Sequence, residues 1–343
     1  MALPIKPPYP PMEAISVGEI PVGPQWQFEP KWDGFRCVAF RDGPRINLQS
    51  KASKPLARYF PELVAELGRL KAAKFVVDGE IVIAVKKAFS FDTLLQRIHP
   101  AQSRIDRLST DFPARFIIFD LLVDADGKNL AKLPLKERRK KLEAFAKKFV
   151  PKNSLLSLSP ATTEHRTIEK WVKRAGNALD GVIAKRLDLA YRSGERDGMQ
   201  KIKTLKSADC VVGGFRYATR RPAVGSLLLG LYDDAGLLNH VGFIAVSKSL
   251  GTEELTAKLK KLVSPPGFTG DAPGRPSRWS TARSAQWQPL KTKLVVEVQY
   301  DHFTGGRFRH GTKFLRWRPD KAPQQCTLTQ VIRESGVPLA LLQ

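Results

Sequence analysis

The chain has 343 residues, and its 57 Lys and Arg residues against 33 Asp and Glu give a formal net charge of +24. This excess indicates a polyanionic partner, because each phosphate that a cationic side chain neutralises releases condensed counterions. No apolar run approaches the ~20 residues of a membrane span, and three scattered cysteines without a CxxC pair argue against a disulfide framework or a zinc ribbon.

The first half of the chain predicts short strands and helices separated by turn signals. Residues 1–25 are rich in proline and predict an extended arm, and Asp42-Gly43 is a strong hairpin signal. Pro61 can begin a helix, since the first helical position needs no N–H donor. The expected elements are a hairpin at 36–40 and 45–49, a helix from 61, a strand at 75–84, a helix at 91–98, a strand at 116–123, helices at 135–149 and around 171–175, and a strand at 180–187.

The pattern changes near Lys206, where short strands become dominant. The expected elements are strands at 210–217, 226–232 and 239–245, a helix at 252–262, a loop at 264–277, and strands at 294–300 and 313–317. About five strands with one helix between them match a small Greek-key barrel of the OB type. The sequence therefore predicts two domains that meet near residue 205.

The stretch 31–36, Lys-Trp-Asp-Gly-Phe-Arg, is the most informative part of the sequence. A lysine becomes a nucleophile when burial or neighbouring cations lower the pKa of its ammonium. Attack of Lys31 on the α-phosphorus of a nucleotide would leave a covalent lysyl-nucleotide. Taken alone, the six residues suit an exposed lysine before a turn equally well.

Further strings of the same character follow in a fixed order. They are Asp78-Gly79-Glu80, Phe119-Asp120, Asp180-Gly-Val-Ile-Ala-Lys185, Lys201-Ile202-Lys203 and Arg318-Pro319-Asp320-Lys321. The K-x-D-G-x-R string resembles the nucleophile motif of covalent nucleotidyltransferases, and the ordered set resembles the motifs of ATP-dependent DNA ligases. Strings 28–36 and 314–321 are most similar to compact bacterial ligases of the ligase C type, which are related to the ligase module of the end-joining enzyme ligase D.

The likeness extends over nearly the whole chain and implies an α+β fold. Residues 1–205 would form a nucleotidyltransferase (ATP-grasp-like ligase) domain of antiparallel sheets and helices. Residues 206–343 would form an OB-fold β-barrel. Such enzymes seal nicks between a 5′-phosphate and a 3′-hydroxyl through a lysyl-AMP and then a DNA-adenylate.

The resemblance also implies a role for each motif residue. Lys31 would be the nucleophile. The nucleotide-binding roles are hydrogen bonding to the adenine amino group by Glu29, purine stacking by Phe119, ribose binding by Glu80, phosphate or ribose binding by Arg36, and phosphate binding by Lys185, Lys201 and Lys203. Arg318, Asp320 and Lys321 would hold the pyrophosphate, and Asp180 with Glu80 would hold Mg²⁺ or Mn²⁺.

Three positions depart from the common motifs. Asp180 stands where glutamate is usual, which shortens the reach of a metal ligand by one methylene. Met199 replaces a frequent tryptophan. Lys51 replaces the arginine of a Ser-Arg pair, so a bidentate phosphate contact becomes a point charge and a weaker hold on the 5′-phosphate is expected.

The expected partner is nicked double-stranded DNA, with repair proteins as further partners and a cytoplasmic, nucleoid-associated monomer as the acting form. Basic and aromatic strings at 216–221 and 307–310 suit contacts to the DNA backbone, whereas the basic run at 138–141 suits a solvated helix face better. Two alternatives stay open: an RNA ligase or GTP-using capping enzyme, and a non-catalytic basic OB-fold protein that coats single strands. The second leaves residues 28–203 unexplained.

Overall fold

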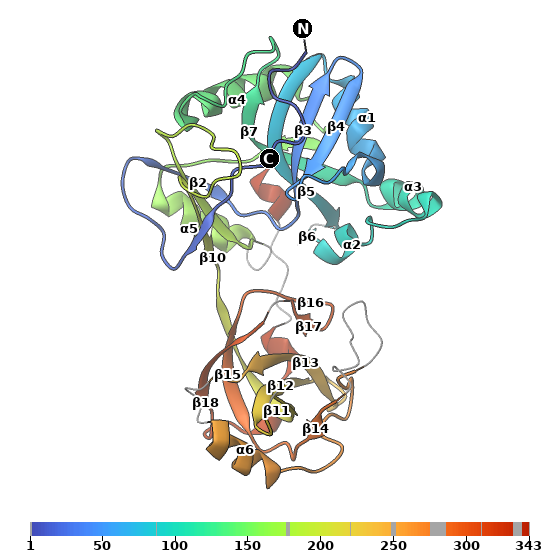
Figure 1. Ribbon diagram of the computed structural model, residues 1–343, viewed down its shortest axis with the longest axis vertical. Coiled ribbons are helices and arrows are strands. Elements are labelled where there is room, and N and C mark those ends of the chain that lie inside the picture. Colours follow the sequence, from blue (N-terminus) through green and yellow to red (C-terminus); the bar gives the residue numbers. More distant parts are fainter. Residues whose placement is uncertain are drawn as a thin grey trace. The chain divides into compact units, whose positions relative to one another are not determined.

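The computed structural model describes residues 2–86, 88–175, 179–219, 221–247, 252–274, 286–309, 311–331 and 338–342. The chain forms two compact units, Met1–Thr204 with Glu334–Gln343, and Leu205–Arg333 (Figure 1). The sequence placed all residues after 205 in the second domain. The structure instead groups the segment from Glu334 onward with the first unit.

The first unit contains two sheets. One has the strand order β4 (Arg45–Ser50), β3 (Phe35–Asp42), β5 (Lys74–Val85), β7 (Ala114–Val123) and β8 (Leu156–Leu158), with β6 (Ala88–Phe89) beside β5. The other has the order β1 (Ile15–Val17), β10 (Met199–Lys203), β9 (Gly181–Arg186) and β2 (Trp26–Pro30). The sequence analysis did not predict β2, although it carries the residues that lead into the lysine motif.

Helices cover the larger sheet. They are α1 (Pro61–Arg69), α2 (Phe91–Leu95) and α4 (Leu135–Phe149), while α3 (Gln102–Asp111) packs against α1 and α5 (His165–Ala175) packs against β2 of the smaller sheet. Leu63 and Leu67 of α1 share a buried core with Leu142 and Phe145 of α4 and with alternate residues of the sheet. Two predictions were incomplete here: α2 ends at Leu95 instead of residue 98, and α3 was not foreseen.

Strand β7 contains a bulge that matters for the site. Its pairing with β5 runs from Asp78 opposite Asp120 directly to Gly79 opposite Ile118, which leaves Phe119 as the extra residue. Ile118 and Leu121 both belong to the core that contains Leu63 and Leu67. They are three positions apart, whereas a regular strand directs every second side chain to the same face. A bulge redirects the side chains beside it. The side chain of Phe119 therefore does not follow the regular alternation of side chains between the two faces of the sheet.

The second unit is built mainly from antiparallel strands. Its ladder runs β13 (Leu238–Ala245), β12 (Val224–Tyr232), β11 (Lys206–Tyr217), β15 (Val295–Tyr300) and β18 (Lys313–Trp317), with β14 (Gln288–Pro289) beside β11. A hairpin of β16 (Phe303–Thr304) and β17 (Arg307–Phe308) and the helix α6 (Thr252–Lys260) complete it. Within the described residues the ladder is not closed, and an isolated bridge from Ile244 to Thr312 joins its two outer strands.

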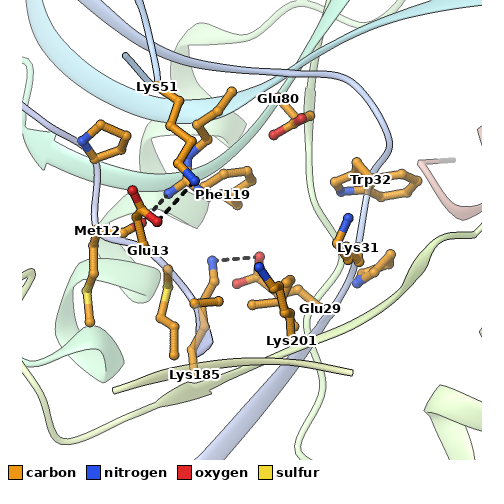
Figure 2. Close-up of a pocket in the computed structure, with 16 residues that line it drawn as sticks. Met12, Glu13, Glu29, Lys31, Trp32, Lys51, Glu80, Phe119, Lys185 and Lys201 are labelled. Atoms are coloured by element: carbon orange, nitrogen blue, oxygen red, sulfur yellow. Dashed lines mark hydrogen bonds and ion pairs between the residues drawn. The ribbon is translucent and has the colours of Figure 1, made fainter. Parts of the chain in front are cut away.

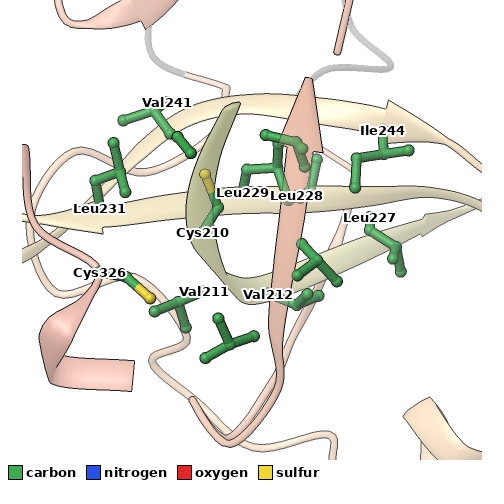
Figure 3. Packing of buried hydrophobic residues seen from close by; sticks show 14 of the residues in the cluster. Cys210, Val211, Val212, Leu227, Leu228, Leu229, Leu231, Val241, Ile244 and Cys326 are labelled. Atoms are coloured by element: carbon green, nitrogen blue, oxygen red, sulfur yellow. The ribbon is translucent and has the colours of Figure 1, made fainter. Parts of the chain in front are cut away.

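The core of this unit is formed by aliphatic residues from facing strands (Figure 3). Leu227, Leu229 and Leu231 of β12 are fully buried together with Val241 and Ile244 of β13. The strands, the helix and this core agree with the predicted OB-type domain. Residues 275–277 of the predicted loop at 264–277 lie outside the described residues.

The chain returns to the first unit at its C-terminal end. A short 3-10 helix, η6 (Pro338–Leu341), packs against α5 and β6. Leu341 is 9% exposed and belongs to a core with Trp26, Phe28 and Trp32. The C-terminal segment therefore covers the strand that carries the lysine motif.

We expect Leu341→Ala to destabilise the first unit by about 2 kcal/mol, the low end for truncation of a buried leucine. Urea denaturation with hydrogen exchange of β2 peptides would measure the change. Leu315→Ala, at a 40%-exposed position of the second unit, is the matched control and should have little effect. Equal stability of Leu341→Ala and the native chain would contradict the packing.

Candidate active site

The lysine motif is attached by its backbone to the start of β9. The Lys31 N–H donates to the Gly181 carbonyl at 2.9 Å, and the Asp180 N–H donates to the Lys31 carbonyl at 3.3 Å. Gly34 has no room for a side chain, since a Cβ there would overlap the Ile81 carbonyl oxygen, and Gly181 has a φ of +136°. These features bring together Lys31 and Asp180, which are 149 positions apart in the sequence.

The Lys31 ammonium forms an ion pair with the Asp180 carboxylate. Burial acts to lower the pKa of Lys31, but the carboxylates of Asp180, Glu80 and Asp33 outweigh it and raise that pKa above its ordinary value. The sequence analysis named neighbouring cations as one way to lower the pKa of the amine, and Lys185, Lys201 and Lys203 are the cations of the motifs. The structure shows the opposite shift, because the three carboxylates outweigh burial.

Glu80 lies on β5 directly opposite Arg36 of β3. Burial raises its pKa from 4.5 to about 7, while the charges of Arg36 and Lys31 oppose the rise. Glu80 thus titrates near neutral pH and faces the same ammonium as Asp180. It can accept hydrogen bonds from hydroxyl groups or, when ionised, bind a cation.

Glu29 is buried at 2% exposure on β2, two residues before Lys31. Its two carboxylate oxygens accept hydrogen bonds from Gln27 Nε2 at 2.9 Å and from Lys185 Nζ at 2.8 Å. Arg139 Nη1 lies 3.9 Å from Glu29 Oε1 and has no hydrogen-bond partner of its own. Two donors therefore fix the direction of the Glu29 carboxylate, and the Arg139 charge lies nearby.

Phe119, placed by the bulge in β7, is flanked by two cations. The Arg36 Cζ lies 4.6 Å and the Lys185 Nζ 4.3 Å from its ring centroid. Phe119 is 7% exposed and lines the cavity, so its ring provides a flat apolar surface inside a cationic surrounding. A purine with its phosphates requires that combination.

Arg36 is held by groups that the sequence analysis did not identify. Its guanidinium donates two hydrogen bonds of 2.6 Å to Asp78 and one of 3.2 Å to the Met12 carbonyl. The Tyr191 hydroxyl donates to Asp78 at 2.6 Å and accepts from the Met12 N–H at 2.9 Å. Asp78 raises the pKa of Arg36 despite its burial, so the guanidinium stays charged.

The N-terminal arm forms one wall of the site. Residues 11–14 line a cavity of about 150 Å³ together with the motif residues (Figure 2). The predicted residues in this lining are Glu29, Lys31, Arg36, Glu80, Phe119, Lys185 and Lys201. Proline content indicated an arm, but no local pattern in residues 1–25 indicates where the arm packs.

Lys201 and Lys203 project from β10, where they pair with Ile183 and Gly181 of β9. Burial lowers the pKa of Lys201, and the nearby charges of Lys51, Lys31, Lys203 and Arg196 lower it further. Lys201 thus lies among several cations, two of them, Lys31 and Lys203, from the motifs. Such a group favours the binding of phosphate oxygens.

The basic helix α4 differs from its expected role. Arg138 donates to both oxygens of Asp120 at 2.8 and 2.9 Å, and Arg139 donates to Glu143 and to the Ser159 carbonyl. Both side chains are buried and therefore structural, so the expectation of a solvated face was wrong for them. Lys140 and Lys141 are exposed, as a solvated face requires.

The expected pyrophosphate ligands lie in the second unit, where acids hold them. Arg318 donates to Asp209 at 2.9 and 3.0 Å and to Asp320 at 2.8 Å. Lys321 donates to Asp209 at 2.7 Å. Asp209, which the sequence analysis missed, orders both cations.

No group of three or more His, Cys, Asp or Glu side chains suited to a metal ion occurs among the described residues. Asp180 and Glu80 nevertheless offer two carboxylates that act on the same ammonium. Mg²⁺ is commonly held by one or two carboxylates plus substrate phosphates, so this pair fits the ion.

Comparisons with known proteins identify the family of the chain. The family model for the ATP dependent DNA ligase domain matches residues 14–203, and that for the ATP dependent DNA ligase C terminal region matches residues 220–321. The chain therefore belongs to the ATP-dependent DNA ligases.

The similarity to individual members of the family extends over the full chain. DNA ligase C of Mycobacterium tuberculosis is 41% identical, with 99% of this chain and 98% of the relative covered. DNA ligase C1 of Mycolicibacterium smegmatis is 43% identical, with 96% of each covered. A solved Lig E DNA ligase shares the fold at a TM-score of 0.54 and 16% identity, covering 90% of this chain and all of that one.

We expect Asp180→Asn to lower the pKa of Lys31, because it removes the largest charge that raises it. The pKa of Lys31 can be measured without ATP or metal by acylation with a small amine-reactive reagent over a range of pH. Peptide mass spectrometry would follow the extent of modification of Lys31. Asp188→Asn is the control, because the Asp188 carboxylate pairs with Arg186 at an exposed position, and it should leave the Lys31 curve unchanged. A curve that does not move in Asp180→Asn would contradict the ion pair.

We further expect Glu80 to make the first unit less stable as pH rises from 4.5 to about 7. In this window the folded state retains a proton on Glu80 that the unfolded chain releases, so stability falls with pH. The free energy of unfolding of Glu80→Gln, measured against that of the native chain by urea denaturation, should therefore be more favourable at pH 8 than at pH 5. The expected difference is on the order of 2 kcal/mol. Glu169→Gln, at an exposed position of α5, should keep the native pH dependence.

Proposed function

We propose that this ligase joins 5′-phosphate and 3′-hydroxyl ends at nicks in double-stranded DNA, with Lys31 as the residue that carries AMP. The observation that carries the proposal is the position of Lys31. It directly follows β2, lines the same cavity as Glu29, Phe119 and Glu80, and pairs with the Asp180 carboxylate.

In the first step the Lys31 amine attacks the α-phosphorus of ATP, a P–N bond forms, and pyrophosphate leaves with the P–O bond electrons. Phe119 stacks on the adenine, Glu29 accepts from its amino group, and Glu80 binds the ribose. Lys31 must lose a proton before it attacks, because the Asp180 carboxylate pairs with its ammonium. Lys185, Lys201 and Lys203 hold phosphate oxygens.

The later steps use the same residues. The 5′-phosphate of the nick attacks the lysyl-AMP to form a DNA-adenylate, which frees Lys31. The 3′-hydroxyl then attacks the 5′-phosphorus and releases AMP. Both are phosphoryl-group transfers, in which positioning and charge stabilisation supply most of the catalysis.

Asp180 and Glu80 are the residues that would hold Mg²⁺ or Mn²⁺ at this site, where the cation would neutralise charge on the reacting phosphate. A cation held there would offset the negative charge by which these carboxylates raise the pKa of Lys31. Arg318 and Lys321, together with Asp320, bind the pyrophosphate in the first step. Asp209 keeps both cations ordered until then.

The same proposal includes the partner and the setting. Nicked duplex DNA in repair is the substrate, and the net charge of +24 supports binding to it. We propose a monomer in the bacterial cytoplasm, close to the nucleoid and to repair proteins. Among the described residues, no helix combines the length and apolar character that crossing a membrane demands.

The decisive experiment incubates the protein with Mg²⁺ and α-labelled ATP or GTP and analyses it on a denaturing gel. We expect acid-labile label from ATP that is absent in Lys31→Ala, followed by sealing of a nicked duplex with a 5′-phosphate. Label from GTP alone would favour a capping enzyme. Absence of label from both nucleotides would contradict the enzymatic proposal and favour a protein that only binds nucleic acid. Sealing of RNA strands alone would contradict the assignment of DNA as the substrate.

A further inference from the structure

A carboxylate of the N-terminal arm lies among cations at the mouth of the site. Glu13 Oε2 is 3.0 Å from Lys51 Nζ and 3.3 Å from Arg196 Nε. Figure 2 shows Glu13 directed at Lys51 on the side of the cavity away from Trp32. Neither cation is buried, since Lys51 is 58% and Arg196 68% exposed.

The backbone fixes this position more firmly than the ion pairs do. The Glu13 N–H donates to the Glu195 carbonyl at 2.8 Å, and the preceding residue, Met12, is held on both sides by Arg36 and Tyr191. The carboxylate is therefore presented to the two cations by a rigid segment. The hydrogen bond from Lys51 lowers the pKa of Glu13, so Glu13 is ionised at neutral pH.

The cations around Glu13 belong to a larger group. Lys51 and Arg196 both act on Lys201, as do Lys31 and Lys203. Lys31 already pairs with Asp180, whereas Lys51 and Arg196 are exposed and share the Glu13 carboxylate, and like charges gathered at one place favour an anion among them. A DNA phosphate would satisfy the set, and Glu13 supplies one negative charge at the same place.

We propose that Glu13 occupies the position of the nick's 5′-phosphate between Lys51 and Arg196, and that the phosphate must displace it to bind. Glu13 thereby makes the site selective, because an end without the phosphate gains nothing from Lys51 and Arg196 that Glu13 does not already provide. The inference rests on the proposed function and adds to it a residue that sets the affinity for the phosphorylated end.

The test measures binding of the purified lysyl-AMP form to fluorescent nicked duplexes in EDTA, where no transfer occurs. Two duplexes are compared, one with a 5′-phosphate and one with a 5′-hydroxyl at the nick. Glu13→Gln should lower the dissociation constant for the 5′-phosphate nick by about two- to fivefold, the scale of an exposed ion pair, and leave the 5′-hydroxyl nick unchanged.

Glu19→Gln is the matched control, since it makes the same change of charge at an exposed position of the same arm. It should show no preference for the 5′-phosphate. In a Lys51→Ala background, Glu13→Gln should lower the dissociation constant for the 5′-phosphate nick by a smaller factor. One of the two cations that would bind the phosphate in place of Glu13 is then missing.

Equal gains on both duplexes, or no gain, would overturn the inference. A gain in Lys51→Ala as large as that in the native chain would also overturn the part assigned to Lys51. Failure of the proposed function looks different: no lysyl-AMP form could then be prepared from the native chain.

Discussion

The buried ion pair between Arg36 and Asp78 connects the parts of the site that come from distant stretches of the sequence. Asp78 is fully buried and accepts from both Arg36 and Tyr191, while Arg36 and Tyr191 together hold the backbone of Met12. Loss of one partner would leave a buried charge uncompensated, at a cost of roughly 3–5 kcal/mol. This group of contacts ties the N-terminal arm to β3 and β5, the strands that carry Arg36 and Asp78.

The charges of the site are divided into two sets with different tasks. Carboxylates raise the pKa of Lys31, whereas cations gather around Lys201. A protonated lysine cannot attack a phosphorus, so the proposed role of Lys31 requires that the ammonium lose its proton before the first step. The departure from glutamate to Asp180 fits this arrangement, since the shorter side chain still reaches the ammonium.

Ordered motifs allowed most of the site to be predicted from the sequence. Lys31, Glu29, Phe119, Glu80 and Lys185 line one cavity, although their roles remain predictions. The missed features depend on tertiary contacts. The bulge at Phe119 lies in an apolar run whose pattern is uniform, and Arg138 and Arg139 look like surface residues until Asp120 and Ser159 are placed beside them. The direction of the Lys31 pKa shift likewise depends on which charges fold closest to it.

The return of the chain to the first unit has a consequence for the modular reuse of these enzymes. The second unit, Leu205–Arg333, is an insertion flanked on both sides by the first unit instead of a terminal appendage. A chimera of two relatives with a single crossover near residue 205 would combine β2 of one parent with Leu341 of the other. Leu341 shares a buried core with Trp26, Phe28 and Trp32, so a substitution in one of these two distant stretches changes the packing of the other.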